Sequence, residues 1–310
     1  MFDALFLKLK TLGIEIEPAT LKKHSVQGFM SSVYTISSSA GELVLHMLTP
    51  KAEQARQRTW EKAAGLYTLL EQQGIPSARV LAVEEEDGVY TSAQEKLPGT
   101  SAGVRVRKGM TIVDQWAVPR NLFSDIEKML AKLHSTHVAG YGWIVADAGS
   151  IRGAYKTWEA FLENEINFWL ATIRPLDPDI TERAERYFFP LSKHPQFTGP
   201  ASLVHNDMTN PSNILVNEGK ITGIVDWEWA LAGDPAMEFE FNNQYPLDDY
   251  FAARGIKSSE ERADFRRRIE FYKPLFLLWG LCVHADDPGG ALYQTLRFNL
   301  EKTLGQVSRV

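Results

Sequence analysis

Residues 203–217 read Leu-Val-His-Asn-Asp-Met-Thr-Asn-Pro-Ser-Asn-Ile-Leu-Val-Asn, and residues 221–229 read Ile-Thr-Gly-Ile-Val-Asp-Trp-Glu-Trp. Short apolar runs bounded by turn residues are typical of strands. Three such runs occur here, at 203–204, 214–216 and 221–225. The last two are separated by Asn217-Glu218-Gly219-Lys220, which predicts a hairpin turn.

Polar residues occupy the loop between the first two runs and the end of the third. His205, Asp207 and Asn213 lie in the loop, and Asp226 closes the third run. Phosphoryl transfer needs one carboxylate free to take a hydroxyl proton, while another carboxylate and an amide oxygen hold Mg²⁺ on the nucleotide phosphates. Any one of these residues alone would be ordinary turn chemistry. Their combination favours a kinase.

The combination resembles the aminoglycoside phosphotransferase and choline kinase-like family, which are small-molecule kinases with the two-lobed protein-kinase fold. The resemblance covers nearly the whole chain. It implies that Asp207, in the His-x-Asp motif, is the catalytic base and that His205 braces the catalytic loop. It also implies that Asn213 and Asp226 are the Mg²⁺ ligands.

The spacing within the loop departs from the family pattern. Five residues, 208–212, separate Asp207 from Asn213, where the family usually has four. The loop must therefore bulge, or Asn210 replaces Asn213 as a metal ligand. Asn213 is favoured because only this asparagine is followed by the strand-like Ile-Leu-Val.

The expected fold is α+β, with two lobes. Residues 1–99 would form a small nucleotide-binding lobe with an antiparallel sheet, ending in a hinge. Residues 100–310 would form a larger, mostly helical lobe with the catalytic loop and the acceptor pocket. Apolar residues at helical spacing predict helices around 126–133, 158–170, 269–283 and 292–304. Residues 101–122 show no clear period.

Several N-terminal residues are candidates for binding the nucleotide. The turn with Gly28, Ser31 and Ser32 would offer backbone N–H groups and hydroxyls to the phosphates. Val44 and His46 share a strand face, because side chains alternate along a strand. His46 stands where the family usually has lysine or arginine. An ordinary imidazole titrates near pH ~6.5, so the nucleotide KM is expected to rise with pH.

Two further nucleotide contacts are expected in this lobe. Residues 53–73 predict a helix, and Glu61 on it is the candidate partner of His46. The stretch that begins Glu95-Lys96-Leu97 and continues Pro98-Gly99 resembles the hinge of the family, where backbone groups hydrogen-bond adenine. Proline and glycine also make this stretch a natural lobe boundary.

Composition limits the class of protein. The 310 residues are 44% hydrophobic and 23% charged with a net charge of −6, which is typical of a soluble protein and argues against a nucleic-acid surface. No secretory signal or membrane span is evident. A single cysteine, Cys282, fits a reducing cytoplasm. The basic triplet 266–268 is interpreted as a solvated helix face, and Asp234 before Pro235 as a helix cap.

The predicted function is Mg²⁺-dependent transfer of the γ-phosphoryl group of ATP, or of GTP, to a hydroxyl of a small molecule. Family resemblance favours an aminoglycoside-type antibiotic as the acceptor. A choline, ethanolamine or sugar-type metabolite kinase shares every motif, and a non-catalytic nucleotide-binding pseudokinase is a further alternative. A protein kinase is disfavoured, because Thr209 stands where that group usually has lysine. The sequence leaves a monomer and a homodimer open.

Overall fold

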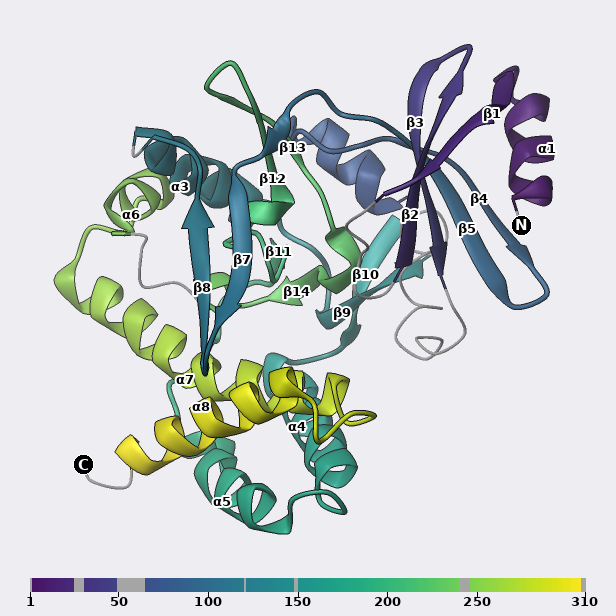
Figure 1. The fold of residues 1–310 in the computed structure, drawn as a ribbon. Helices are drawn as coiled ribbons and strands as arrows, with labels where there is room; N and C mark the ends of the chain where they lie inside the picture. Colours follow the sequence, from purple (N-terminus) through teal and green to yellow (C-terminus); the bar gives the residue numbers. More distant parts are fainter. Residues whose placement is uncertain are drawn as a thin grey trace. The chain divides into compact units, whose positions relative to one another are not determined.

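The computed structural model describes residues 2–24, 31–48, 65–119, 121–147, 150–239 and 246–307 (Figure 1). The chain forms two compact units. The first unit comprises Met1–Thr100, Ile144–Ile151 and Ile214–Glu228. The second unit comprises Ser101–Trp143, Arg152–Asn213 and Trp229–Val310. The first unit thus includes two short segments from beyond the hinge.

The first unit is built on an antiparallel five-stranded sheet with the strand order β1-β2-β3-β5-β4. Its strands are β1 (Ile16–Lys23), β2 (Ser31–Ser38), β3 (Gly41–Leu48), β4 (Val80–Glu86) and β5 (Val89–Glu95). Helix α1 (Asp3–Thr11) places Leu5 and Leu9 in one core with Leu43 and Leu45 of β3. Val44 and His46 therefore lie on the opposite face of the sheet. This sheet confirms the fold expected for the N-terminal lobe.

The predicted helix over 53–73 is described only in part, as helical turns over 65–72. Leu66 and Leu70 are its buried residues. Gly28 and Glu61 lie outside the described residues. Helix α1 and strand β1 were not predicted, because their apolar residues are few and are interleaved with charged ones.

Strands β12 (Ile214–Asn217) and β13 (Lys220–Ile224) form the predicted hairpin in the first unit. Glu218 and Gly219 take positive φ values of 50° and 76°, the conformation that a two-residue hairpin turn requires. The end of β13 is tied down, because the Ile224 N–H donates to the Pro76 carbonyl oxygen at 2.8 Å. Asp226 lies two residues after this fixed point.

The second unit is mainly helical. Its helices are α3 (Asn121–His134), α4 (Trp158–Ile173), α5 (Pro178–Phe188), α6 (Asp248–Arg254), α7 (Ser259–Val283) and α8 (Ala291–Val307). Four of them, α3, α4, α7 and α8, were predicted from apolar spacing. Of the apolar residues that predict α8, Leu296, Leu300 and Leu304 are buried, whereas Leu292 is 36% exposed. Helix α5 was missed because most of its residues are charged or polar.

Strands and short 3-10 turns complete the fold, and two strands of the second sheet have residues in both units. A four-stranded sheet has the order β10-β9-β14-β11. Its strands are β9 (Tyr141–Asp147), β10 (Ser150–Tyr155), β11 (Ser202–Val204) and β14 (Leu231–Gly233). The 3-10 turns are η2 (Leu191–Lys193), η3 (Pro211–Asn213), η4 (Trp227–Trp229) and η5 (Pro235–Phe239). The boundary between the two units falls within η4, after Glu228.

Most of residues 101–122, which the sequence left unassigned, form a β-hairpin. After the short strand β6 (Thr100–Ser101), β7 (Gly103–Lys108) pairs with β8 (Thr111–Trp116). Apolar and polar residues of the hairpin do not follow its buried and exposed positions. Val104, which is apolar, is 49% exposed, whereas Asp114, which is charged, is largely buried. The mostly helical lobe that the sequence predicts therefore carries a β-hairpin in the segment that the sequence did not assign. No helix among the described residues is long and apolar enough to cross a membrane.

Candidate active site

The predicted catalytic loop begins where β11 ends, at His205, and runs to η3. Asp207 lies in this loop with its carboxylate bonded at both oxygens. Oδ2 accepts hydrogen bonds from Nδ2 of Asn213 at 2.9 Å and of Asn210 at 3.0 Å, and Oδ1 accepts one from Nη1 of Arg105 at 2.7 Å. Burial raises the pKa of Asp207, and the Arg105 guanidinium opposes this shift.

The additional loop residue is accommodated by two successive turns. The Asn210 N–H donates to the Asp207 carbonyl oxygen at 3.1 Å, and the Asn213 N–H donates to the Asn210 carbonyl oxygen at 3.0 Å. The Asn210 side-chain oxygen accepts the Ser212 N–H at 3.1 Å and is therefore used within the loop. The Asn213 amide turns its nitrogen to Asp207, so its side-chain oxygen is not used in that contact. This arrangement supports Asn213 over Asn210 as the cation ligand.

A buried glutamate from η5 holds the backbone of the loop. Glu238 is fully buried, and its carboxylate accepts the backbone N–H groups of His205 at 2.8 Å, Asn206 at 3.0 Å and Met208 at 2.6 Å. Burial alone would raise the pKa of Glu238, but His134, His205 and these backbone donors together lower it. The sequence around Glu238 does not reveal this role, because its partners lie 30 to 33 residues earlier in the chain.

Two buried histidines complete this support. His205 is fully buried, as a bracing residue would be. His134 ends α3, and its Nδ1 lies 2.9 Å from the Tyr250 hydroxyl. Its Nε2 lies 3.7 Å from Glu238, which is longer than a hydrogen bond. Burial lowers the pKa of His134.

Asp234 caps η5, as predicted, and has a second role. Its Oδ1 accepts the Ala236 N–H at 3.0 Å, which confirms the cap. Its Oδ2 accepts hydrogen bonds from Nε of Arg268 and the hydroxyl of Tyr272, both at 2.8 Å. Arg268 is only 13% exposed, so the solvated interpretation of the basic triplet was wrong for this residue. The sequence could not show that its partner lies 34 residues away.

Asp226 belongs to the first unit. It is exposed and takes a φ of 68°, a left-handed conformation that aspartate tolerates better than most residues. Tyr67, on the helix over 65–72, lies near it. Burial raises the pKa of Tyr67, and the negative charges of Asp226 and Glu228 add to this shift. Asn206 in the catalytic loop has a similar φ of 69°. Strained residues of this kind concentrate at functional sites.

The sequence model of the phosphotransferase enzyme family, APH, matches residues 24–241. The chain belongs to this family. It is a phosphotransferase, and the expected family and enzyme class are confirmed. No curated protein sequence matches the chain.

Solved structures share the fold along the whole chain. A thermostable mutant of aminoglycoside phosphotransferase APH(4)-Ia in its apo form is 16% identical, with 99% of each chain covered and a TM-score of 0.70. A ternary complex of a variant of that enzyme with AMP-PNP and hygromycin B is also 16% identical, with 98% of each chain covered and a TM-score of 0.67. Macrolide 2'-phosphotransferase MphH from Brachybacterium faecium, as the apoenzyme, is 16% identical, with 95% of this chain and 96% of that chain covered and a TM-score of 0.56. The predicted two-lobed fold class is thereby confirmed.

His46 of this APH-family chain lies on β3, opposite Val33 of β2 and Ser92 of β5. Burial, with a smaller contribution from the charge of His24, lowers the pKa of His46 to about 4. The imidazole is therefore neutral near pH 7. The expectation that it titrates in the neutral range is wrong for the free protein, because that expectation assumed a solvated ring.

The remaining predicted nucleotide residues lie in the first unit. Ser32 and Val44 are half-buried in β2 and β3, and Ser31 pairs with Leu48 at the end of that ladder. In the hinge, the side chain of Glu95 pairs with Arg79 and that of Lys96 with Glu42. The N–H groups of Glu95 and Lys96 also donate to strand neighbours. The prediction of an adenine contact therefore rests on Leu97 and on the carbonyl oxygens of the hinge.

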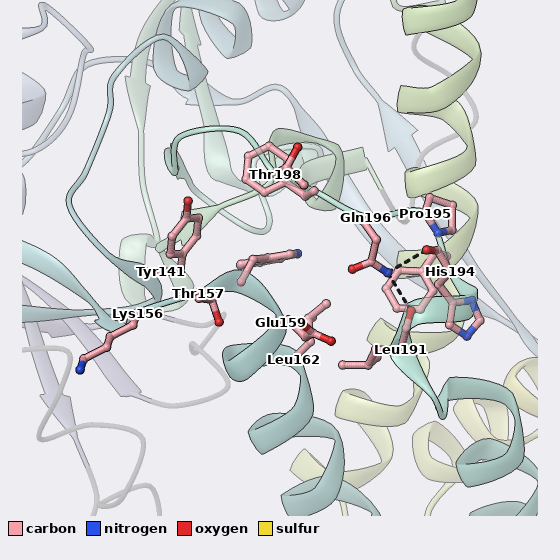
Figure 2. Close-up of a pocket in the computed structure, with 13 residues that line it drawn as sticks. Tyr141, Lys156, Thr157, Glu159, Leu162, Leu191, His194, Pro195, Gln196 and Thr198 are labelled. Atoms are coloured by element: carbon pink, nitrogen blue, oxygen red, sulfur yellow. Dashed lines mark hydrogen bonds between the residues drawn. The ribbon is translucent and has the colours of Figure 1, made fainter.

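A cavity of about 280 Å³ lies in the second unit (Figure 2). It is lined by the start of α4, the segment 191–198, Tyr141 and Phe271, and none of the lining residues belongs to the loop 205–213. Two polar side chains of its wall are used internally. Nε2 of Gln196 donates to the carbonyl oxygens of Leu191 and His194, both at 2.8 Å, and the Tyr141 hydroxyl donates to the Gly199 carbonyl oxygen at 3.0 Å. It is therefore not assigned as the acceptor pocket.

Proposed function

We propose that this phosphotransferase moves the γ-phosphoryl group of ATP, or of GTP, to a hydroxyl of a small molecule. The observation that carries the proposal is the fixed carboxylate of Asp207. Its loop is held by a buried carboxylate on η5, and the carboxylate itself by donors on both oxygens. A base within hydrogen-bond reach of the acceptor is the central requirement of this reaction.

The residues also fit a Mg²⁺ ion. Hard cations prefer carboxylate and amide oxygens, and Asn213 and Asp226 offer one of each. When bound, the ion would neutralise charge on the nucleotide phosphates. Asp207 accepts the proton as the acceptor O–H bond breaks. The acceptor oxygen then bonds to the γ-phosphorus, and ADP leaves with the bridging oxygen.

The leading acceptor is an aminoglycoside-type antibiotic. Family membership supports an acceptor of small size, and the structural neighbours include an aminoglycoside phosphotransferase crystallised with hygromycin B. The net charge of −6 is compatible with a cationic acceptor. Choline, sugar-type metabolites and macrolides are the alternatives that the same machinery could serve.

A nucleotide-consumption screen tests the proposal. Protein with Mg²⁺ and ATP or GTP is offered aminoglycosides, macrolides, choline and sugar alcohols, and phosphorylated products are identified by mass spectrometry. Asp207→Asn should still bind nucleotide but lose turnover by a factor of about 10² to 10⁴, the usual effect of a positioned base. Near-normal kcat in this variant would refute the role of Asp207. Nucleotide binding without turnover for any acceptor would favour a pseudokinase.

A further inference from the structure

Arg105 lies on β7 and reaches the catalytic loop. Its Nε and Nη2 donate to Oδ1 and Oδ2 of Asp114, its register partner on β8, at 2.7 and 3.1 Å. Its Nη1 donates to Oδ1 of Asp207 at 2.7 Å. The side chains of Arg105, Asp114 and Asp207 are only 15%, 7% and 21% exposed. Water therefore screens this cluster much less than it screens a surface ion pair.

The hairpin that carries Arg105 is anchored at both ends. At its tip, Nδ2 of Asn299 on α8 donates to the Met110 carbonyl oxygen at 2.9 Å. At its other end, β7 packs against η3, and the Ser101 hydroxyl donates to the Ser212 carbonyl oxygen at 3.2 Å. Figure 1 shows β7 and β8 extending to α8. Because both ends are fixed, holding Arg105 in place requires little additional ordering.

Both oxygens of the Asp207 carboxylate are thereby held. Asn210 and Asn213 donate to Oδ2, and Arg105 donates to Oδ1. A carboxylate held at one oxygen can rotate about its Cβ–Cγ bond, whereas donors on both oxygens fix its plane. This matters for a base, because a displacement of about 1 Å can cost about 10² in rate.

We propose that Arg105 is a positioning residue for phosphoryl transfer. Clamped by Asp114, its guanidinium fixes the Asp207 carboxylate at the oxygen that does not bind Asn210 or Asn213. This inference rests on the proposed role of Asp207 as the base. The competing interpretation is that Arg105 only stabilises the hairpin through its cross-strand pair with Asp114.

A matched set of variants separates the two interpretations. Arg105→Gln and Asp114→Asn each remove the cross-strand ion pair, but only the first also removes the contact to Asp207. Arg107→Gln is the control, because Arg107 is on the same strand and its Nη1 donates to the Gly109 carbonyl oxygen at the hairpin tip. Circular dichroism and thermal unfolding confirm that each variant folds.

Arg105→Gln should lower kcat by about 10- to 100-fold while the nucleotide KM stays unchanged, because the base is displaced and the nucleotide site is not altered. Asp114→Asn should lower kcat less than Arg105→Gln does, because the asparagine oxygen can still accept from Arg105 and the contact from Arg105 to Asp207 remains. Arg107→Gln should match the wild type. Arg105→Lys should recover part of kcat, because an ammonium keeps the charge but not the fork of donors.

Equal losses in Arg105→Gln and Asp114→Asn would overturn the proposal in favour of hairpin stability. Wild-type or higher kcat in Arg105→Gln would overturn it as well. Hydrogen exchange of the loop peptide 203–216 gives a readout that does not depend on turnover. Exchange there should increase in Arg105→Gln but not in Asp114→Asn or Arg107→Gln. If the wild-type protein phosphorylates no acceptor, the proposed function fails, whereas the exchange comparison still decides whether Arg105 orders the loop.

Discussion

At the scale of single residues, Glu238 shows how a buried charge can organise a loop. Its carboxylate lies in the interior, and its contacts are to backbone N–H groups and a histidine rather than to an arginine or lysine. Hydrogen bonds to a charged group are stronger than neutral ones and favour the charged form. The loop therefore has one geometry in which three N–H groups converge on Glu238.

Glu238→Gln should destabilise the protein and slow turnover. The amide NH₂ group would face a backbone N–H that then has no acceptor, at a cost of about 1–3 kcal/mol. Urea unfolding and kcat measure the two effects. Glu182→Gln is the control, because the Glu182 side chain is 65% exposed, and its effect should stay within about 0.5 kcal/mol. Equal stability of the two variants would contradict the role given to Glu238.

His46 should make the protein sensitive to acid. In the unfolded chain a histidine titrates near pH ~6.5, whereas burial holds the pKa of His46 at about 4 in the folded protein. Between these values the unfolded chain binds more protons, so the free energy of unfolding falls as the pH is lowered through this window. Urea unfolding at about pH 7 and pH 5 should show a smaller decline for His46→Gln than for the wild type. Parallel declines would contradict the lowered pKa.

The same pKa changes the expectation for nucleotide binding. Because the pKa of His46 is about 4 and its ring is neutral near pH 7, the nucleotide KM should not follow its titration through the neutral range. His46→Lys should lower the KM if the side chain at this position faces the phosphates. An unchanged KM in that variant would remove His46 from the nucleotide site.

At the scale of elements, η5 and α7 are joined through one buried carboxylate. Asp234, at the start of η5, has no exposed surface and is bonded by Arg268 and Tyr272 of α7. The Tyr272 hydroxyl also accepts a hydrogen bond from Nε1 of Trp158 at 2.8 Å, so α4 joins the same network. Since η5 carries Glu238, the packing of these helices is linked to the catalytic loop.

Arg268→Ala should destabilise the protein by about 3–5 kcal/mol, because it leaves the Asp234 carboxylate buried without its cation. Denaturant unfolding measures the loss. Arg267→Ala is a matched control, since Arg267 is 59% exposed and pairs with Asp264 on the helix surface. It should change stability by less than about 1 kcal/mol. A similar effect of both substitutions would mean that the network adds nothing to an ordinary surface pair.

At the scale of the whole molecule, the two compact units each carry one of the proposed cation ligands. Asp226 lies in the first unit and Asn213 in the second. A nucleotide with Mg²⁺ that binds the folded protein and not the unfolded chain should stabilise the folded state. At about 100 times its Kd, a ligand adds about 2.7 kcal/mol to the free energy of unfolding.

Thermal unfolding with ATP should separate the contributions of the ligands. Mg²⁺ together with ATP should raise the Tm of the wild type more than ATP alone. Asp226→Ala should abolish the Mg²⁺-dependent part, because a carboxylate lost from a hard-cation site is rarely replaced by water. Asn213→Ala should weaken it less. A larger effect of Asn210→Ala than of Asn213→Ala would show that the ligand in the longer loop was assigned wrongly.

The sequence by itself determined the features that depend on neighbours along the chain. The His-x-Asp loop, the hairpin over 214–224 and the apolar stripes of α3 and α4 follow from turn chemistry and periodicity, and these act over a few residues. The predicted fold class followed from the order of such local signals, which together resemble one family of kinases.

Only the tertiary structure decided which distant residues meet. Arg105 is 102 residues from Asp207, and Glu238 is 30 residues from Met208. Neither has a local pattern that names its partner, because an ion pair or a hydrogen bond depends on distance in space and not along the chain. Burial in the sheet likewise made His46 neutral, a property that its place in the sequence does not carry. The sequence named the chemistry at Asp207, and the fold supplied the groups that hold it.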